Sequence, residues 1–473
     1  MVRHLRRLAL WAAPTAFIAV LFFWPLTSIA AAGFSPGWFE DLARPEFQGA
    51  IWFTIWQALV STLLCLAIGL PIAFVLYRRK FFGSRLLRTI LVIPFVLPAI
   101  VVAIALTDFR QLLAGSTILV ILIAHVFLNI ALVVRVVGPA WASIDHETDE
   151  AAELDGANGI KKFFFVTTAQ LRPALVSSAA LVFLFCATSF ATVLSLGEGQ
   201  VNSIETAIYF ALTQRLDLQT AAALALVQTL ITVAAFALSR KFSDSAFIVE
   251  LTSEEINSKP IGRRDIPILL FSLFAIFVLF VIPIASLFVK AFTRAGEFNL
   301  KAFADLAGYG ARNILDITVF EAAGNSLRNA VVAASIAVLF GVLIAWLLTQ
   351  TKSRWPDLIF ALPLGISSVV LGFGYLITFG GEPLALRQSW LVVPLVQALI
   401  TMPLVVRITY SALATLGKTT REAASNAGAD TWQIWRFIET PNIRPAIATA
   451  LGFALLSSIG EFGSSVLLAY SDQ

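Results

Sequence analysis

Long apolar blocks separated by short polar segments run along the whole chain. Eleven blocks are about 20 residues or longer, which is the length of helix that crosses about 30 Å of hydrocarbon. They are 8–31, 50–76, 89–107, 115–134, 174–196, 219–238, 266–289, 328–349, 357–379, 390–410 and 445–469. The pattern predicts an all-α polytopic membrane protein with eleven spans.

Composition agrees with this interpretation. The chain is 59% hydrophobic and only 13% charged, whereas soluble globular proteins carry about 25% charged residues. These values exclude an ordinary cytosolic enzyme, a nucleic-acid-binding domain and a disordered chain. Cys65 and Cys186 lie in apolar blocks and are expected to be core residues, and the three histidines are too scattered for a histidine-based metal site.

The distribution of positive charge predicts the orientation. With the N-terminus in the cytoplasm and the spans alternating, cytoplasmic segments hold 24 of the 33 Lys and Arg residues, counting Arg407 at the edge of the last segment. Cytoplasmic loops of membrane proteins are enriched in these residues. We therefore expect the N-terminus and the segments 77–88, 135–173, 239–265, 350–356 and 411–444 to be cytoplasmic.

The chain is a tandem repeat with an offset of 272 residues. Leu132–Arg135 recurs as Leu404–Arg407, Glu150–Ala152 as Glu422–Ala424, Gly69 as Gly341 and Gly156 as Gly428, while Pro94 matches Pro363 at an offset of 269. An even number of spans separates the matching points, so the halves share one orientation in the membrane. We predict a first half over 1–240, a cytoplasmic linker over 241–265 and a second half over 266–473.

The second half is shorter than the first. It ends at Gln473, which corresponds to Val201, whereas the first half continues to a further span at 219–238. Two halves of about six helices each are therefore expected, with the last helix of the second half missing through truncation or supplied by another chain.

Each half contains one long cytoplasmic loop with the same motif. The first has Glu150, Ala151, Ala152 and Gly156, and the second has Glu422, Ala423, Ala424 and Gly428 followed by Pro441. Each loop is predicted to form two short helices around the glycine, the first capped by Thr148 or Thr420 and the second by Asn158 or Asp430. Ile160 and Phe163 match Trp432 and Trp435, and their spacing of three places each pair on one helix face. Such a face is suited to a groove on a partner protein.

The full motif resembles the signature loop of bacterial ABC-importer permeases: Glu-Ala-Ala, three residues, Gly, nine residues, Ile, any residue, Leu-Pro. The second copy has Thr440 in place of Leu, and the first has Val166, Thr168 and Ala169 in place of Ile, Leu and Pro. In that family these loops form coupling helices that dock on ATPase subunits. The resemblance implies two ATP-binding cassette partners that hold ATP and Mg, an extracytoplasmic substrate-binding protein, and a location in the bacterial cytoplasmic membrane. It implies no cofactor on this chain.

Two further segments indicate the cargo. The fusion of both halves in one chain resembles the permeases of thiamine and ferric-iron importers. Ser189–Gly197 and Ile204–Tyr209 are most similar to the thiamine permeases, and Ser458–Gly463 is similar to both. The resemblance implies transport of thiamine or a thiamine phosphate, with ferric iron as the alternative. Ser189, Phe190, Glu461 and Phe462 are candidates for the substrate pathway. An acid within or near the end of a span is costly and usually has a function, although Glu461 is also compatible with an interfacial carboxylate paired with a neighbour.

Other function classes fit less well. An ion-coupled secondary transporter is expected to bury acids or bases near broken helices, and the spans are almost free of them. Gly417-Lys418-Thr419 resembles the end of a phosphate-binding loop, but Ala412 stands where that motif requires glycine. We therefore expect no catalytic residue and no ATP hydrolysis by this chain. His125, within a span, is expected to form a hydrogen bond between helices.

Overall fold

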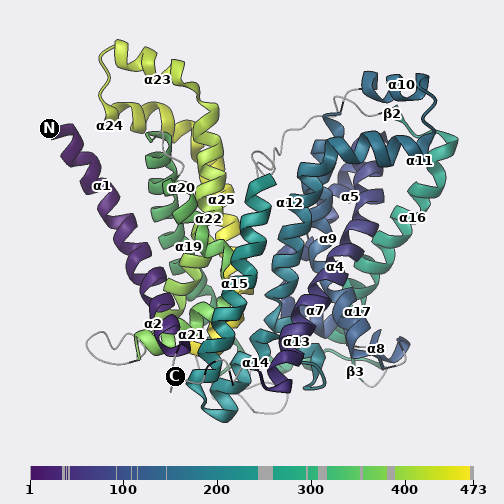
Figure 1. Ribbon diagram of the computed structural model, residues 1–473, viewed down its shortest axis with the longest axis horizontal. Helices are drawn as coiled ribbons and strands as arrows, with labels where there is room; N and C mark the ends of the chain where they lie inside the picture. Colours follow the sequence, from purple (N-terminus) through teal and green to yellow (C-terminus); the bar gives the residue numbers. More distant parts are fainter. Residues whose placement is uncertain are drawn as a thin grey trace. The chain divides into compact units, whose positions relative to one another are not determined.

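A computed structural model describes most of the chain (Figure 1). It leaves out residues 1, 35–37, 39, 41–42, 92, 108, 114, 145, 243–258, 295–296, 307–316, 352–354, 381–388 and 469–473. Most of the predicted linker over 241–265 therefore lies outside the described residues. Among those residues, strands are confined to two short pairs, β1 (Arg79–Lys80) with β2 (Lys259–Pro260) and β3 (Thr293–Arg294) with β4 (Glu297–Phe298).

Long apolar helices make up the rest, as the hydropathy pattern predicts. In the described part of the chain, nine are long and apolar enough to cross a membrane, and a bent helix pair brings the number to ten. Some combine several elements: Leu10–Gly33 (α1, η1, α2), α4 (Pro45–Arg78), α9 (Thr117–Ala142), Phe163–Ala187 (η2, α12), α15 (Leu218–Phe242), Arg263–Phe292 (η4, α16, η5, α17), α19 (Val319–Thr349), α22 (Val392–Thr415) and Thr431–Gly460 (α24, η8, α25). The all-α polytopic fold is confirmed.

The third predicted span of each half is interrupted. The range 89–107 is divided among α5 (Ser84–Ile90), α6 (Ile93–Val96) and α7 (Ala99–Leu106), so the prediction of a continuous helix there is wrong. The range 357–379 forms α20 (Trp355–Ala361), η6 (Leu362–Gly365) and α21 (Ser368–Thr378), with a bend of 95°. Proline provides the physical reason, because it lacks the amide hydrogen and clashes with the preceding turn. Pro94 is the second residue of α6 and Pro363 is the second residue of η6, so each stands where a new helical segment begins.

Two compact units form, and each combines parts of both sequence halves. One unit contains residues 1–38, 211–229 and 313–473, and the other contains 39–210 and 230–312. In the first unit, Phe17 stacks on Phe340 of α19 with ring centroids 4.3 Å apart. In the second, the Ser286 hydroxyl of α17 (Ile282–Phe292) donates to the carbonyl oxygen of Ala105 in α7 at 3.0 Å. The first span of each half therefore packs on helices of the other half. The division of the sequence into 1–240, 241–265 and 266–473 stays a prediction.

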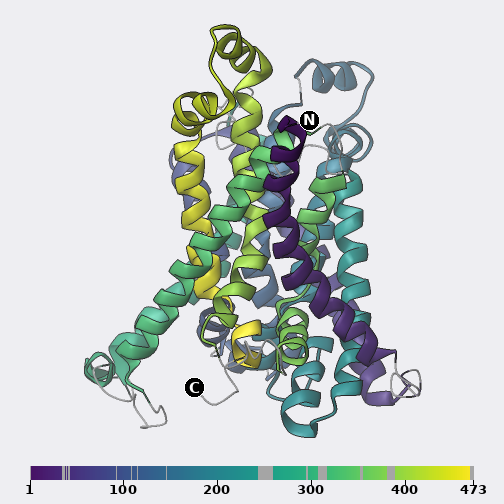
Figure 2. The ribbon, with the colours of Figure 1, turned by 90° about the vertical axis from the view of Figure 1, so that its left-hand side faces the viewer.

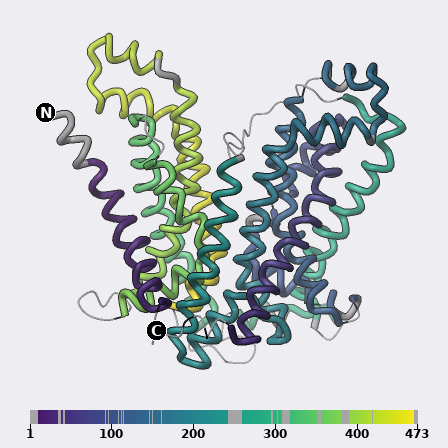
Figure 3. Tube along the Cα trace, viewed as in Figure 1, coloured from purple at the N-terminus to yellow at the C-terminus, as the bar shows by residue number. Residues whose placement is uncertain are grey.

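The central helix pair of each unit is built in the same way. A Cβ atom placed on Gly69 of α4 would lie 2.9 Å from Cγ1 of Val133 in α9. The equivalent Cβ on Gly341 of α19 would lie 2.6 Å from Cγ1 of Val405 in α22. Only glycine lets the helices approach this closely. The Cα trace follows both pairs along their length (Figure 3).

Candidate coupling loops and pathway residues

The two motif loops share one backbone path. The first contains α10 (His146–Leu154), α11 (Gly159–Lys162) and η2 (Phe163–Thr167), which leads into α12 (Thr168–Ala187). The second contains α23 (Gly417–Asn426), α24 (Thr431–Ile434) and η8 (Trp435–Glu439), which leads into α25 (Thr440–Gly460). The two π-helical segments, η2 and η8, lie at the repeat offset. In the first unit the start of α1 and the second loop lie at the same end of the helices (Figure 2).

A glycine ends the first helix of each loop, as predicted. Gly156 has φ of +81° and Gly428 has φ of +90°. The next amide, of Ala157 or Ala429, donates to the carbonyl oxygen of Ala152 or Ala424 at 3.0 Å. This is the Schellman arrangement, in which a left-handed residue satisfies the last carbonyls of a helix.

The predicted caps are correct for the second helices only. The Asn158 carboxamide oxygen accepts from the Lys161 amide at 2.9 Å, and the Asp430 carboxylate accepts from the Gln433 amide at 2.8 Å. Thr148 and Thr420 lie inside α10 and α23, because these helices begin earlier than the motif indicates. The motif side chains differ in burial: Glu150, Ala151, Glu422, Ala423 and Pro441 are exposed, whereas Ala152 is buried and Ala424 is half-buried.

The aromatic residues of the two loops differ in burial, and their placement on one helix face stays a prediction. Trp435 is half-buried against Trp346 of α19, with ring centroids 5.7 Å apart, whereas Trp432 is 63% exposed. Phe163 likewise packs on Trp141, at 5.8 Å, and the side chain of Ile160 lies outside the described part of the structure.

The sequence analysis missed the aromatics that both loops expose. Phe165 and Phe437 are separated by the repeat offset and are 78% and 68% exposed. Phe164 is exposed as well. The offset was a sufficient signal, because it aligns Phe165 with Phe437 as directly as it aligns the two glycines. These rings are the apolar groups that the two loops present in common.

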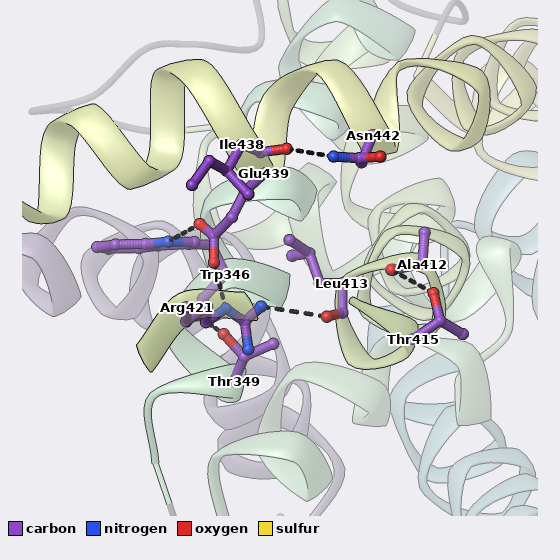
Figure 4. A network of polar contacts seen from close by, with 9 residues as sticks. All are labelled: Trp346, Thr349, Ala412, Leu413, Thr415, Arg421, Ile438, Glu439 and Asn442. Carbon is purple, nitrogen blue, oxygen red and sulfur yellow. Dashed lines mark hydrogen bonds and ion pairs between the residues drawn. The ribbon is translucent and has the colours of Figure 1, made fainter. Parts of the chain in front are cut away.

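A buried polar network holds the base of the second loop (Figure 4). Glu439, at the end of η8, is 1% exposed. Its carboxylate accepts from the Arg421 guanidinium at 2.5 Å and from the Trp346 indole nitrogen at 2.9 Å. Arg421 also donates to the carbonyl oxygen of Leu413 at 3.1 Å. The ion pair therefore joins α23 and η8 to the ends of α19 and α22.

The first loop is held by other side chains. Arg78, which is 3% exposed, donates to the carbonyl oxygens of Trp141, in the last turn of α9, at 3.4 Å and of Ile144, just after that helix, at 2.7 Å. Trp141 also packs on Phe74, with ring centroids 5.3 Å apart. The repeat places Thr167 where the second loop has Glu439. An arginine and aromatic rings thus replace the buried ion pair.

An ion pair also joins the two helices of the first loop. The Lys162 ammonium lies 2.6 Å from the Glu153 carboxylate. The hydrogen bond from Lys162, together with its positive charge, holds the pKa of Glu153 below its ordinary value. Both residues are outside the spans, where water screens the interaction.

The predicted pathway residue Ser189 lies in a polar chain inside the second unit. Its hydroxyl is 2.7 Å from His125 Nε2, and His125 Nδ1 is 3.0 Å from the Ser61 hydroxyl of α4. His125 is fully buried, so the prediction of an interhelical hydrogen bond is confirmed. Phe190 begins α13 (Phe190–Gly197) and is buried with its ring 5.5 Å from that of Tyr209 in α14 (Ile204–Phe210).

Glu461 and Phe462 occupy the equivalent positions in the first unit. The Glu461 carboxylate accepts from the Ser464 amide at 3.1 Å and from the Ser464 hydroxyl, so it caps α26 (Gly463–Leu468). Both Glu461 and Phe462 are half-buried. This capping supplies Glu461 with a local structural role, and a contact of these four residues with substrate stays a prediction.

Comparison with known proteins finds the same duplication, because one family model matches the chain twice. Residues 65–247 and 337–470 each match the family model described as the binding-protein-dependent transport system inner membrane component. The two matches begin 272 residues apart, which is the offset of the repeat, and together they cover more than half of the chain.

Similar proteins of this kind have been named from several bacteria. The thiamine transport system permease protein of Brucella abortus is 29% identical over 454 residues, covering 90% of this chain and 81% of the relative. That of Escherichia coli is 26% identical, covering 94% and 87%. A ferric transport system permease protein of Haemophilus influenzae is 24% identical, covering 70% and 54%. From the two family matches, the chain belongs to the family of binding-protein-dependent transport system inner membrane components.

Proposed function

We propose that the chain is the permease of an ATP-driven importer whose cargo is thiamine or a thiamine phosphate. The observation that carries the cargo assignment is the similarity to proteins named thiamine permeases, which extends over 81–87% of their length. The residues Ser189, Phe190, Glu461 and Phe462 are proposed to line or gate the pathway. An extracytoplasmic binding protein would deliver the substrate.

The two motif loops are proposed to couple the chain to two ATP-binding cassette subunits. Their matched backbone, fixed by Gly156 and Gly428, and their exposed Phe165 and Phe437 support this role. A rigid helix pair with an aromatic side chain at its surface can transmit a displacement into the span that follows it. ATP and Mg would be bound by the partner subunits, whose closure would convert the pathway from inward-facing to outward-facing.

The proposed location is the cytoplasmic membrane of a bacterium, with the N-terminus in the cytoplasm. The charge distribution supports this orientation. The position of α1 supports it too, because its start lies at the same end of its unit as the second coupling loop.

Ferric iron is the second candidate cargo. The similarity to a ferric transport permease supports it, but covers only 54% of that relative. Among the residues that the structure describes, no group of three or more His, Cys, Asp or Glu could hold a metal ion. Thiamine is therefore the cargo to test first.

The decisive experiment is uptake of labelled thiamine, with labelled ferric iron in parallel, by cells that carry or lack this gene and its partners. Thiamine uptake that depends on the gene and on ATP supports the proposal. Uptake of iron alone would show that the cargo is ferric iron and not thiamine. Uptake driven by an ion gradient without ATP would indicate a secondary transporter.

A variant of the second loop tests the coupling separately. Phe437→Ala removes an exposed ring from the loop, and Phe320→Ala removes one of similar exposure, 65%, at the start of α19. Removing an anchor ring from a docking surface costs about 2 kcal/mol or more of binding. We expect weaker ATPase binding and slower uptake for Phe437→Ala only. Equal behaviour of both variants at equal abundance would exclude docking through this ring.

A further inference from the structure

The end of the predicted linker is attached to the residues that follow α4. Lys259–Pro260 pairs in parallel with Arg79–Lys80, which directly follow α4. The Arg79 guanidinium donates two hydrogen bonds to the Asp265 carboxylate, at 2.7 and 3.0 Å. The side chains of this pair are only 19% and 15% exposed, so solvent screens the pair less than an ordinary surface ion pair. Asp265 lies immediately before α16 (Ile266–Ile276), the first span of the second sequence half.

A continuous set of contacts runs from this ion pair to the coupling loop. Cζ of Arg79 lies 4.7 Å from the centroid of the Phe74 ring. The Phe74 ring is 5.3 Å from that of Trp141, which in turn is 5.8 Å from that of Phe163, the first residue of η2. We call this set, from Asp265 through Arg79, Phe74 and Trp141 to Phe163, the Arg79 chain. All of its members lie within one compact unit.

The second loop has only part of such a chain, since Trp346 and Trp435 stand at the positions of Phe74 and Phe163 and their ring centroids are 5.7 Å apart. At the repeat offset, Thr351 stands at the position of Arg79 and Leu413 at that of Trp141. The first spans of the two halves align through Pro25 and Pro283, each placed two residues after a π-helical segment. In that alignment Arg7 stands at the position of Asp265. The Arg79 chain is therefore particular to the first loop.

We propose that Arg79 and Asp265 are positioning residues for transport, because they connect the first coupling loop to α16. The proposal rests on the coupling role given above for the loop. Displacement of η2 moves the Phe163 ring, and the packed rings and the ion pair carry the displacement to the start of α16. Further along the same span, Phe280 packs on Phe127 of α9 with ring centroids 5.3 Å apart. One loop thereby controls a span that belongs to the other sequence half.

Hydrogen exchange of the full chain in lipid nanodiscs tests the connection without an ATPase. Phe163→Ala removes the loop end of the Arg79 chain, and Phe165→Ala removes an exposed ring two residues away. We expect amides at 266–270 to exchange about fivefold faster in Phe163→Ala than in the parent chain, a typical size for coupling between linked sites. Phe165→Ala is expected to leave them unchanged. Unchanged exchange in both variants would overturn the proposal.

Charge reversal tests the function of the ion pair. Arg79→Asp and Asp265→Arg are each expected to lower thiamine uptake about fivefold in the complete transporter, and the double variant is expected to restore it. Lys80→Asp, at the exposed neighbouring position, is the control for added negative charge. Single variants with full uptake, or a double variant without recovery, would refute the positioning role. If the parent chain transports no thiamine, the proposed function fails, and the exchange experiment still decides the connection.

Discussion

The two motif loops follow the same path and are held by different chemistry. Each turns at a left-handed glycine, continues through a π-helical segment and exposes a phenylalanine at the same repeat position. The second loop is fixed from within by the buried Arg421–Glu439 pair. The first is fixed from outside, by Arg78 at the end of α4 and by the rings of Trp141 and Phe74.

This difference shows that the backbone conformation of the turn and the side chains that hold the loop are subject to different requirements. The turn requires positive φ, which glycine alone adopts at no steric cost, so both copies retain it. An anchor only has to satisfy buried polar groups and fill space, and an ion pair or an arginine on carbonyl oxygens can do so. The repeat therefore preserves the path of the loop while its supports differ, and the loops are expected to respond differently to loss of their anchors.

The largest effect is expected from Glu439→Ala. Removal of one partner of a buried ion pair leaves the other charge without compensation, which costs about 3 kcal/mol. The apparent melting temperature of the purified chain should fall, and hydrogen exchange should accelerate in 417–440. Thr167→Ala, at the equivalent position of the first loop, is the control and should change little. A similar fall in both variants would show that the buried charge is not the anchor.

Arg78→Met is expected to have the next largest effect. The variant keeps an apolar side chain of similar length but removes the charged hydrogen bonds to Ile144 and Trp141, worth about 2 kcal/mol together. Exchange should accelerate in 142–156 and remain unchanged in 417–430. Gln350→Met changes the equivalent position of the second half and serves as the control. Faster exchange in both loops would contradict separate anchors.

The glycines provide the case in which the two loops should respond alike. A Cβ at Gly156 or Gly428 meets no atom within 4 Å, so the cost of alanine is the left-handed backbone alone, about 1 kcal/mol. Equal losses of thermal stability are expected. Gly159→Ala, within α11, should be neutral or stabilising because alanine favours a helix. Unequal losses for Gly156→Ala and Gly428→Ala would mean that the turns differ after all.

The smallest effect concerns pH and the first loop only. Because Lys162 lowers the pKa of Glu153 in the folded chain, the stabilising interaction is complete above the ordinary glutamate pKa of about 4.3. It is lost as the pH falls through the lowered pKa. Exchange in 150–162, corrected for its intrinsic pH dependence, should therefore increase below about pH 4.3. Glu153→Gln should remove this dependence. The second loop has Ser425 and Ile434 at these positions and should show none.

Hydropathy and the repeat were enough to predict most of the fold and both loop turns. Ten of the predicted spans overlap the nine long helices and the bent pair, but the predicted ends of 174–196 and 445–469 are wrong, because the helices there end at Ala187 and Gly460 and short helices follow. The prediction failed where backbone chemistry overrides hydropathy, because Pro94 interrupts a block that is apolar throughout. The pattern also gave no sign that α1 and α16 pack on the opposite halves, since apolarity does not identify a partner helix.

The site was predicted less completely for a related reason. The spacing of three placed Trp432 and Trp435 on one helix face, but it gave no sign that Trp435 packs on Trp346 while Trp432 is exposed. The Arg421–Glu439 pair joins residues 18 positions apart, a separation that no local pattern detects. A glutamate at the edge of an apolar span was a usable signal, because a charge placed there needs a partner.

The first span of each sequence half packs in the unit formed mainly by the other half, and this arrangement has a consequence for biogenesis. The unit that contains residues 39–210 is completed only by 230–312, and the unit that contains 313–473 also needs residues 1–38. Neither sequence half thus holds all the helices of either unit, and α1 must remain in the membrane without its final neighbours until α19 has been synthesised. Two polypeptides made by cutting within 243–258 should therefore accumulate only when they are expressed together.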